Sequence, residues 1–135
     1  MPRNVEVVKA AHDAFLEGNL DGVLETLDEQ ITWTVPESLP YGGVFDGHQE
    51  VATFFASLSE YYEELELHPT LLMEGADLVM DIGTMKGRGK LAGEEAAFEV
   101  RYCLVWRMRH GKAIEMEEFS DTAGLLRAIG PATGE

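Results

Sequence analysis

Apolar residues recur at helical spacing over the first part of the chain and predict two helices. The first apolar stripe consists of Val5, Val8, His12, Phe15 and Leu16. Gly18 follows this stripe and is a natural helix stop. Asp21 can cap a second, shorter helix that carries Val23, Leu24 and Leu27.

A strand, a loop and a third helix are expected next. The alternating apolar residues of the strand are Ile31, Trp33 and Val35. Pro36 ends this strand, and the prolines and glycines of residues 36–43 predict a loop. Asp46 and Gln49 have capping-box spacing at the start of the third helix. The apolar face of that helix contains Val51, Phe54, Phe55, Leu58, Tyr62 and Leu65.

The period of the apolar positions falls to two in the second half of the chain, which predicts an antiparallel meander. Strands are expected near residues 66–74, 77–90, 96–109 and 112–119, with turns at 75–77, 92–94 and 110–111. The face of the third strand that we expect to be buried carries Phe98, Val100, Tyr102, Leu104, Trp106 and Met108. A last short helix contains Ala123, Leu126 and Ile129 and stops at Gly130-Pro131.

The opposite face of the strand at 96–109 indicates a protein contact. Its ends carry charged residues, whereas Cys103 and Val105 lie in the middle. We therefore expect a second subunit to cover this outer sheet face in a homodimer. Cys103 is the one cysteine of the chain, so it has no internal disulfide partner and no second cysteine for a zinc site.

Length and charge restrict the classes of partner. The chain has 135 residues, which fits a single domain spanning residues 1–135. Its net charge of −15 would repel nucleic acid and anionic lipid, so we expect neither nucleic acid nor a membrane as a partner. No apolar run approaches the ~20 residues of a membrane span. The N-terminal residues lack the apolar stretch of a secretory signal, so we expect a cytoplasmic protein.

Several local signatures occur together in one order. They are Gly-Asn-Leu-Asp-Gly at 18–22, Trp33 before Pro36, Gly-Val-Phe-Asp-Gly-His at 43–48 ahead of Phe54-Phe55, Trp106, Gly111-Lys112 and Glu-Phe-Ser-Asp-Thr at 118–122. In these residues the chain resembles, from about position 4 to 130, the nuclear transport factor 2-like superfamily, and within it the SnoaL-like polyketide cyclase and ketosteroid isomerase-related group. The resemblance implies an α+β fold: a cone-shaped α+β barrel with N-terminal helices packed in a strongly curved antiparallel sheet. This fold serves isomerases, cyclases, dehydratases, epoxide hydrolases and non-catalytic modules.

Positions that differ from the family pattern reduce the number of expected activities. Ala11, Val35 and Leu104 stand where steroid isomerases place an oxyanion-binding tyrosine, a general-base aspartate and a second acid. That exact activity is therefore not expected. Asp121 stands where SnoaL-like cyclases and limonene-type epoxide hydrolases place a working aspartate. The hydrolases also need an Arg and Asp pair, for which Asp81 is available, but the strand face of Asp81 is ambiguous.

Four residues are candidates for proton transfer. Asp121 can move a proton, or it can cap the last helix. Glu118 can point into the cavity, where burial would favour its neutral form, or it can lie on a wet rim. His12 is either a hydrogen-bonded core residue or a base or hydrogen-bond donor in the pocket. Tyr102 is the expected hydrogen-bond donor to a substrate oxygen.

An apolar ligand site is expected in the wide end of the cone, although aromatic residues at these spacings can also simply fill a core. The residues expected to line this site are Trp33, Tyr41, Phe45, Phe54, Phe55, Leu58, Tyr62, Leu104, Trp106 and Phe119. The four histidines show no metal-ligand spacing, so no metal is expected. The glycine patterns match no nucleotide-binding loop, and no cofactor is expected.

These observations favour a small cofactor-free acid/base enzyme that holds an apolar, oxygenated molecule. Isomerisation, aldol-type cyclisation, dehydration and hydration are the reaction classes in range. One alternative is a non-catalytic binding protein for a small hydrophobic ligand. Another is a dimerisation module with a filled cone.

Overall fold

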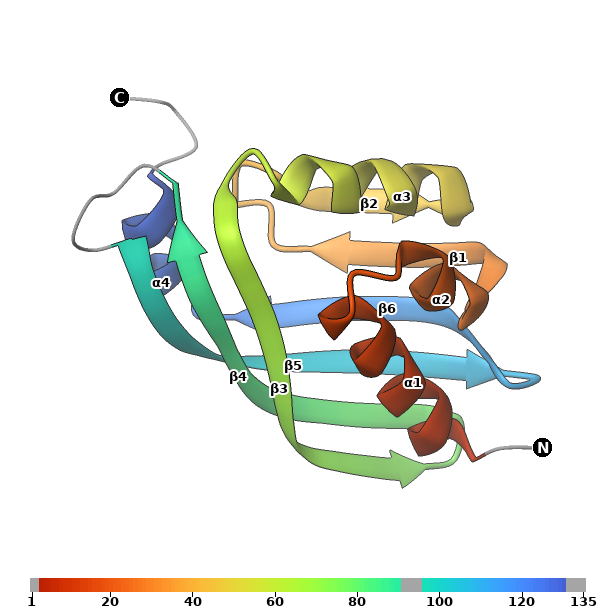
Figure 1. Ribbon diagram of the computed structural model, residues 1–135. Helices are drawn as coiled ribbons and strands as arrows, with labels where there is room; N and C mark the ends of the chain where they lie inside the picture. Colours follow the sequence, from red (N-terminus) through yellow and green to blue (C-terminus); the bar gives the residue numbers. More distant parts are fainter. Residues whose placement is uncertain (1–2, 91–95, 131–135) are drawn as a thin grey trace.

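The computed structural model describes residues 3–90 and 96–130. The elements in chain order are α1 (Asn4–Leu16), α2 (Leu20–Glu25), β1 (Leu27–Val35), β2 (Gly43–Asp46), α3 (Gly47–Leu58), β3 (Tyr62–Gly75), β4 (Leu78–Gly89), β5 (Ala97–Arg109), β6 (Lys112–Ser120) and α4 (Thr122–Ile129). Figure 1 shows α1, α2 and α3 gathered on one side of a curled sheet, with α4 at the far end of β4 and β5. The helices and the sheet thus form two packed layers.

Six strands form one sheet in the order β2-β1-β6-β5-β4-β3. Neighbouring strands are antiparallel except β1 and β6, which run parallel. The sheet curls without closing, so β2 and β3 form its two edges. The predicted α+β cone, with helices packed in a strongly curved sheet, is confirmed. The parallel pair is a feature that the local sequence pattern did not indicate.

Some element boundaries differ from the prediction because strand pairing outweighs helical spacing. Helix α3 ends at Leu58, and both Tyr62 and Leu65 lie in β3, where Leu65 pairs with Gly87 of β4. Leu27 begins β1 rather than ending the second helix. Strand β2 occupies part of the segment that was expected to be loop and helix cap, because it pairs with the end of β1.

The caps of α2 and α3 also differ in detail from the prediction. The side-chain oxygen of Asn19 accepts a hydrogen bond from the backbone N–H of Gly22 at 3.0 Å, so Asn19 caps α2 and Asp21 lies in its first turn. The backbone N–H of Asp46 donates to Glu50 at 2.7 Å, one residue beyond the predicted partner. Both helices therefore begin about where the sequence indicates, but with neighbouring side chains in the capping roles.

The two hairpin turns that the structure describes confirm the prediction. Ala76 and His110 each have a φ of 54°, in the left-handed region that tight hairpin turns require. The expected turn at 92–94 lies outside the described residues, as does Pro131. Among the residues described, no helix is long and apolar enough to cross a membrane.

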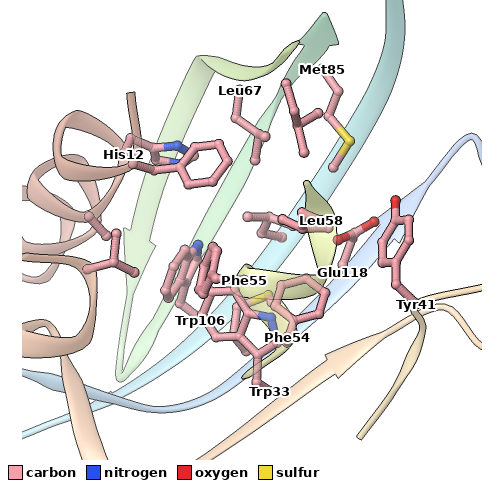
Figure 2. A pocket seen from close by; sticks show the side chains of 16 residues that line it. His12, Trp33, Tyr41, Phe54, Phe55, Leu58, Leu67, Met85, Trp106 and Glu118 are labelled. Atoms are coloured by element: carbon pink, nitrogen blue, oxygen red, sulfur yellow. The ribbon is translucent and has the colours of Figure 1, made fainter. Parts of the chain in front are cut away.

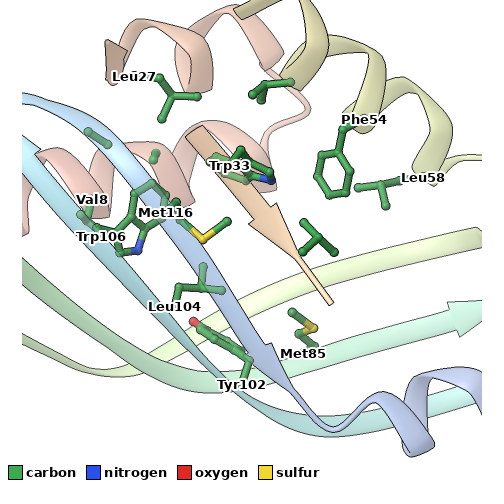
Figure 3. Packing of buried hydrophobic residues seen from close by; sticks show 14 of the residues in the cluster. Val8, Leu27, Trp33, Phe54, Leu58, Met85, Tyr102, Leu104, Trp106 and Met116 are labelled. Atoms are coloured by element: carbon green, nitrogen blue, oxygen red, sulfur yellow. The ribbon is translucent and has the colours of Figure 1, made fainter. Parts of the chain in front are cut away.

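The core lies between the inner face of the sheet and the helices. Figure 3 shows Trp33, Phe54, Met85 and Trp106 converging from β1, α3, β4 and β5. The predicted inner face of β5 is buried, except that Phe98 is only half-buried. This packing leaves the side chains of the inner sheet face pointing toward the helices, where the candidate site is found.

Candidate active site

A largely apolar cavity lies between the N-terminal helices and the inner face of the sheet (Figure 2). Its volume is about 70 Å³, which is room for a few water-sized molecules. A ligand the size of most enzyme substrates would require the cavity to widen. The residues that line it are Ala11, His12, Phe15, Val23, Trp33, Tyr41, Phe54, Phe55, Leu58, Leu65, Leu67, Met85, Leu104, Trp106, Met116 and Glu118.

His12 reaches the cavity from α1 and is held there by Asp81 of β4. The distance from His12 Nε2 to Asp81 Oδ2 is 2.5 Å. His12 is 8% exposed, and Asp81 is completely buried. When His12 donates from Nε2 to the carboxylate, its Nδ1 carries the lone pair.

Two further donors complete the surroundings of Asp81. The hydroxyl of Tyr102 donates to Asp81 Oδ1 at 3.0 Å, and the indole N–H of Trp106 donates to Oδ2 at 3.1 Å. A buried carboxylate is tolerated when its oxygens are hydrogen-bonded in this way. The predicted substrate donor Tyr102 is thus placed with its hydroxyl on Asp81, and it is not among the residues that line the cavity.

The backbone beside Asp81 is adapted to this network. At Gly83, a Cβ atom would lie 2.2 Å from the carbonyl oxygen of His68 and 2.8 Å from the hydroxyl oxygen of Tyr102. Both distances are shorter than side-chain atoms tolerate, so only glycine fits here without a shift. Gly83 therefore keeps the space in which the Tyr102 hydroxyl reaches Asp81.

Sequence reasoning noticed His12 and Asp81 separately but did not pair them. The two residues are 69 positions apart, and the face of β4 that carries Asp81 was ambiguous. The structure places Val79, Asp81 and Met85 on the inner face, where all three are buried. The available signals were Asp81, an acid among inward-facing apolar residues, and His12 on the apolar stripe of its helix. Only the tertiary fold brings the two together.

Glu118 lines the other end of the cavity. Figure 2 shows its carboxyl group turned toward the hydroxyl of Tyr41. Its Oε2 accepts a hydrogen bond from the hydroxyl of Ser120 at 2.8 Å. Burial raises the pKa of Glu118 to about 7, and the Ser120 hydrogen bond opposes this shift only in part. Both its neutral and its ionised form are therefore populated near neutral pH, as general acid–base catalysis requires.

Tyr41 and Tyr62 form a hydroxyl pair next to Glu118. Their oxygens are 2.6 Å apart. Burial is the main cause that raises the pKa of Tyr62 to about 12, and it also raises the pKa of Tyr41 above its ordinary value. The nearby Glu118 adds to both shifts. Both tyrosines therefore remain hydrogen-bond donors at neutral pH.

Asp121 lies at the start of α4. Its Oδ1 accepts a hydrogen bond from the backbone N–H of Gly124 at 3.1 Å, which is the helix-capping alternative considered for this residue. Asp121 is exposed and is not among the residues lining the cavity. The structure therefore brings His12 and Glu118 together around the cavity but leaves Asp121 outside it.

Most of the expected ligand-contacting residues line the cavity. Those that do are Trp33, Tyr41, Phe54, Phe55, Leu58, Leu104 and Trp106. Phe45 packs on Phe54, with ring centroids 5.0 Å apart, and the ring of Tyr62 lies 5.8 Å from that of Tyr41. Phe119 is on the outer face and is 52% exposed, because β6 places residues 118 and 119 on opposite faces.

One buried donor, on a residue that lines the cavity, has no hydrogen-bond partner among the described residues. The indole N–H of Trp33 is buried and has no hydrogen-bond partner within residues 3–90 and 96–130. Unsatisfied buried donors are uncommon in proteins. The same described ranges contain no group of three His, Cys, Asp or Glu side chains placed to hold a metal ion.

Comparison with known families identifies this arrangement. Residues 8–116 match the model of the SnoaL-like domain. The chain belongs to the SnoaL-like family. None of the curated proteins compared with this SnoaL-like chain matches it.

Solved structures agree with the family assignment. An NTF2-like protein of unknown function from Burkholderia pseudomallei is 30% identical, with a TM-score of 0.89 over 96% of the SnoaL-like chain and 99% of its own. TerC, crystallised with polyporic acid, is 27% identical, with a TM-score of 0.86 over 93% of this chain and 97% of its own. A putative SnoaL-like polyketide cyclase from Jannaschia is 21% identical, with a TM-score of 0.79 over 93% and 90%, and shares the fold.

The surroundings of Asp81 differ from those expected for an epoxide hydrolase. An Arg and Asp pair was considered for Asp81, but its hydrogen-bond partners in the described chain are His12, Tyr102 and Trp106. Arg101 of the neighbouring strand is exposed and donates to the carbonyl oxygen of Gly83 at 3.4 Å. The geometry thus pairs this aspartate with a histidine in place of an arginine.

Proposed function

We propose that this protein is a cofactor-free acid/base enzyme of isomerase, cyclase or dehydratase type that acts on a small apolar, oxygenated molecule. The observation that carries this proposal is that two proton-transfer groups, His12 and Glu118, line the same apolar cavity from opposite walls. The SnoaL-like fold includes isomerases and cyclases. Fold alone does not fix an activity, so these side chains carry the proposal.

His12 is the proposed general base. Its Nε2 is fixed by Asp81, so Nδ1 can take a proton from a carbon next to a carbonyl group, and the imidazolium that forms is stabilised by the adjacent carboxylate. Tyr102 and Trp106 hold Asp81 in place and act as positioning residues. The step is a proton transfer alone: the C–H bond breaks, an N–H bond forms, and the electron pair moves onto the carbonyl oxygen.

Glu118 is the proposed general acid. In its neutral form it can donate a proton to the oxygen on which negative charge develops, and a pKa of about 7 lets it regain that proton from solvent. The apolar lining of the cavity strengthens such interactions because it lowers the local dielectric constant. TerC, a relative that has been crystallised with polyporic acid, supports the proposal that the cavity of this fold accepts an organic molecule.

The test is proton exchange on a simple ketone. In D2O, the protein should accelerate exchange of the protons next to the carbonyl of cyclohexanone, followed by proton NMR. His12→Gln retains a donor for Asp81 but no base, and should lower the exchange rate about 100-fold. His68→Gln is the matched control, because His68 is an exposed histidine that pairs with Glu66 outside the cavity.

An exchange rate that His12→Gln leaves unchanged, in a variant that unfolds at the wild-type temperature, would reject the proposal. Binding of cyclohexanone without any acceleration would favour the second candidate, a non-catalytic binding protein. The small size of the cavity and the apolar residues Val35 and Leu104 are the features that favour that candidate.

A further inference from the structure

The pair of tyrosine hydroxyls leaves one proton for a ligand. Tyr41 and Tyr62 share a hydrogen bond of 2.6 Å, and only one of their two protons can lie between the oxygens. Tyr62 is 5% exposed and does not line the cavity, whereas Tyr41 does. Either hydroxyl can be the donor in this pair; in the arrangement in which Tyr62 donates to Tyr41, the proton of Tyr41 is free to point into the cavity.

Glu118 supplies a second group at the same end. Its Oε2 is engaged by Ser120, which leaves Oε1 for a ligand. The titratable groups that face Glu118 among the described residues are Tyr41 and Tyr62, and His12 lies across the cavity. Below its raised pKa of about 7, Glu118 carries a proton that it can donate. Two possible donors therefore lie at the same end of the cavity.

The charge of the cavity determines which oxygen is accepted. No lysine or arginine is among the residues that line it, and the chain carries a net charge of −15. A carboxylate at the tyrosine end would lose its hydration without gaining a positive partner, and it would face Glu118. A neutral carbonyl oxygen requires only the two donors.

We propose that Tyr41, backed by Tyr62, and neutral Glu118 form a subsite for the carbonyl oxygen of uncharged ketones or aldehydes, and that this subsite rejects carboxylates. The inference rests on the proposed function in taking the same cavity as the substrate site, with the carbonyl oxygen opposite His12. Tyr41 contacts the ligand, and Tyr62 is a positioning residue that acts through Tyr41.

The subsite is tested by binding, without turnover, with three probes that share one ring: cyclohexanone, cyclohexanecarboxylate and cyclohexylammonium. The two tryptophans of the chain, Trp33 and Trp106, both line the cavity, so their indole N–H signals in ¹H–¹⁵N NMR spectra report its occupancy. Cyclohexanone should bind at least tenfold more tightly than either charged probe at pH 6. Tighter binding of the carboxylate or the ammonium probe, or binding of none of the three, would overturn the proposal.

The variants separate the individual roles. Tyr41→Phe should weaken cyclohexanone binding about tenfold, and Tyr62→Phe about threefold. Tyr61→Phe is the matched control, because the ring of Tyr61 packs 5.4 Å from that of Tyr41 but lies outside the cavity lining. Equal effects of all three substitutions would show a packing role only and would overturn the assignment.

The pH dependence gives a readout that packing alone would not change. Binding of cyclohexanone should weaken between pH 6 and pH 8 as Glu118 loses its proton, and Glu118→Gln should remove this dependence because an amide remains a donor. Binding that is independent of pH in the wild-type protein would exclude Glu118 from the subsite. If cyclohexanone binds and the variants weaken binding as expected, but no proton exchange occurs, the proposed catalysis is rejected and the subsite is retained. If proton exchange occurs at a rate that Tyr41→Phe does not change, the subsite is rejected and the proposed catalysis is retained.

Discussion

Burial of Glu118 makes the stability of the protein depend on pH. Its pKa is about 7 in the folded chain against an ordinary value of 4.5, so the unfolded chain releases this proton first as pH rises. The stability contributed by the neutral group is fully present below about pH 4.5 and is lost as pH rises through 7. Conversion of the shift to free energy gives a loss of about 3 kcal/mol by pH 8.

Glu118→Gln should therefore stabilise the protein at alkaline pH. The free energy of unfolding at pH 8 should rise by about 2 kcal/mol, while the value at pH 4.5 changes little, because the amide is never ionised. Urea denaturation at both pH values measures the difference. Glu117→Gln is the control, since Glu117 is the exposed neighbour on the opposite face of β6. Equal stabilisation by the two substitutions would contradict burial as the cause.

At the scale of elements, α4 provides the test of Asp121. Asp121→Ala should lower the free energy of unfolding by about 1 kcal/mol through loss of the bond to Gly124, and Asp121→Asn should retain most of it. Neither substitution should change the rate of proton exchange on cyclohexanone, because the side chain lies outside the cavity lining. A large loss of exchange in both variants would instead support the catalytic role that the family resemblance implied.

Elements with a local signal were predictable, and those defined by pairing were not. The stripe of α1 and the alternation of β5 identified their inner faces, since each face repeats within one element. Strand β2 and the start of β3 were missed because only their partners, β1 and β4, fix them. The contact between His12 and Asp81 was not predicted for the same reason, because it depends on how α1 crosses the sheet.

At the scale of the whole molecule, the outer sheet face carries an apolar row that is typical of a protein contact. Strand register aligns Leu71, Ile82, Cys103 and Phe119 across β3, β4, β5 and β6. Leu71 is 46% and Phe119 52% exposed. Ile82 and Cys103 between them are half-buried. Apolar surface of this kind commonly marks an interface, and a two-fold contact would bury the row against a second copy.

We therefore expect a homodimer in solution, with the outer sheet faces in contact. Light scattering should give twice the chain mass of 14.9 kDa, and Ile82→Lys should shift the population to monomer because it buries an unpaired charge. Thr53→Lys, at an exposed position of α3, is the control for added charge. A monomer at high concentration in the wild-type protein would contradict the expectation.

The parallel pairing of β1 with β6 has a consequence for how the chain folds. Trp33 and Met116 are partners in this pair although they lie about 80 residues apart, and closing a loop of that length costs on the order of 4 kcal/mol in chain entropy. Such distant contacts form late and slow the folding of the chain. Both residues line the cavity. During synthesis, the edge of β1 that pairs with β6 therefore has no strand partner until β6 has been made, and this is the stage at which chaperone binding would be most useful.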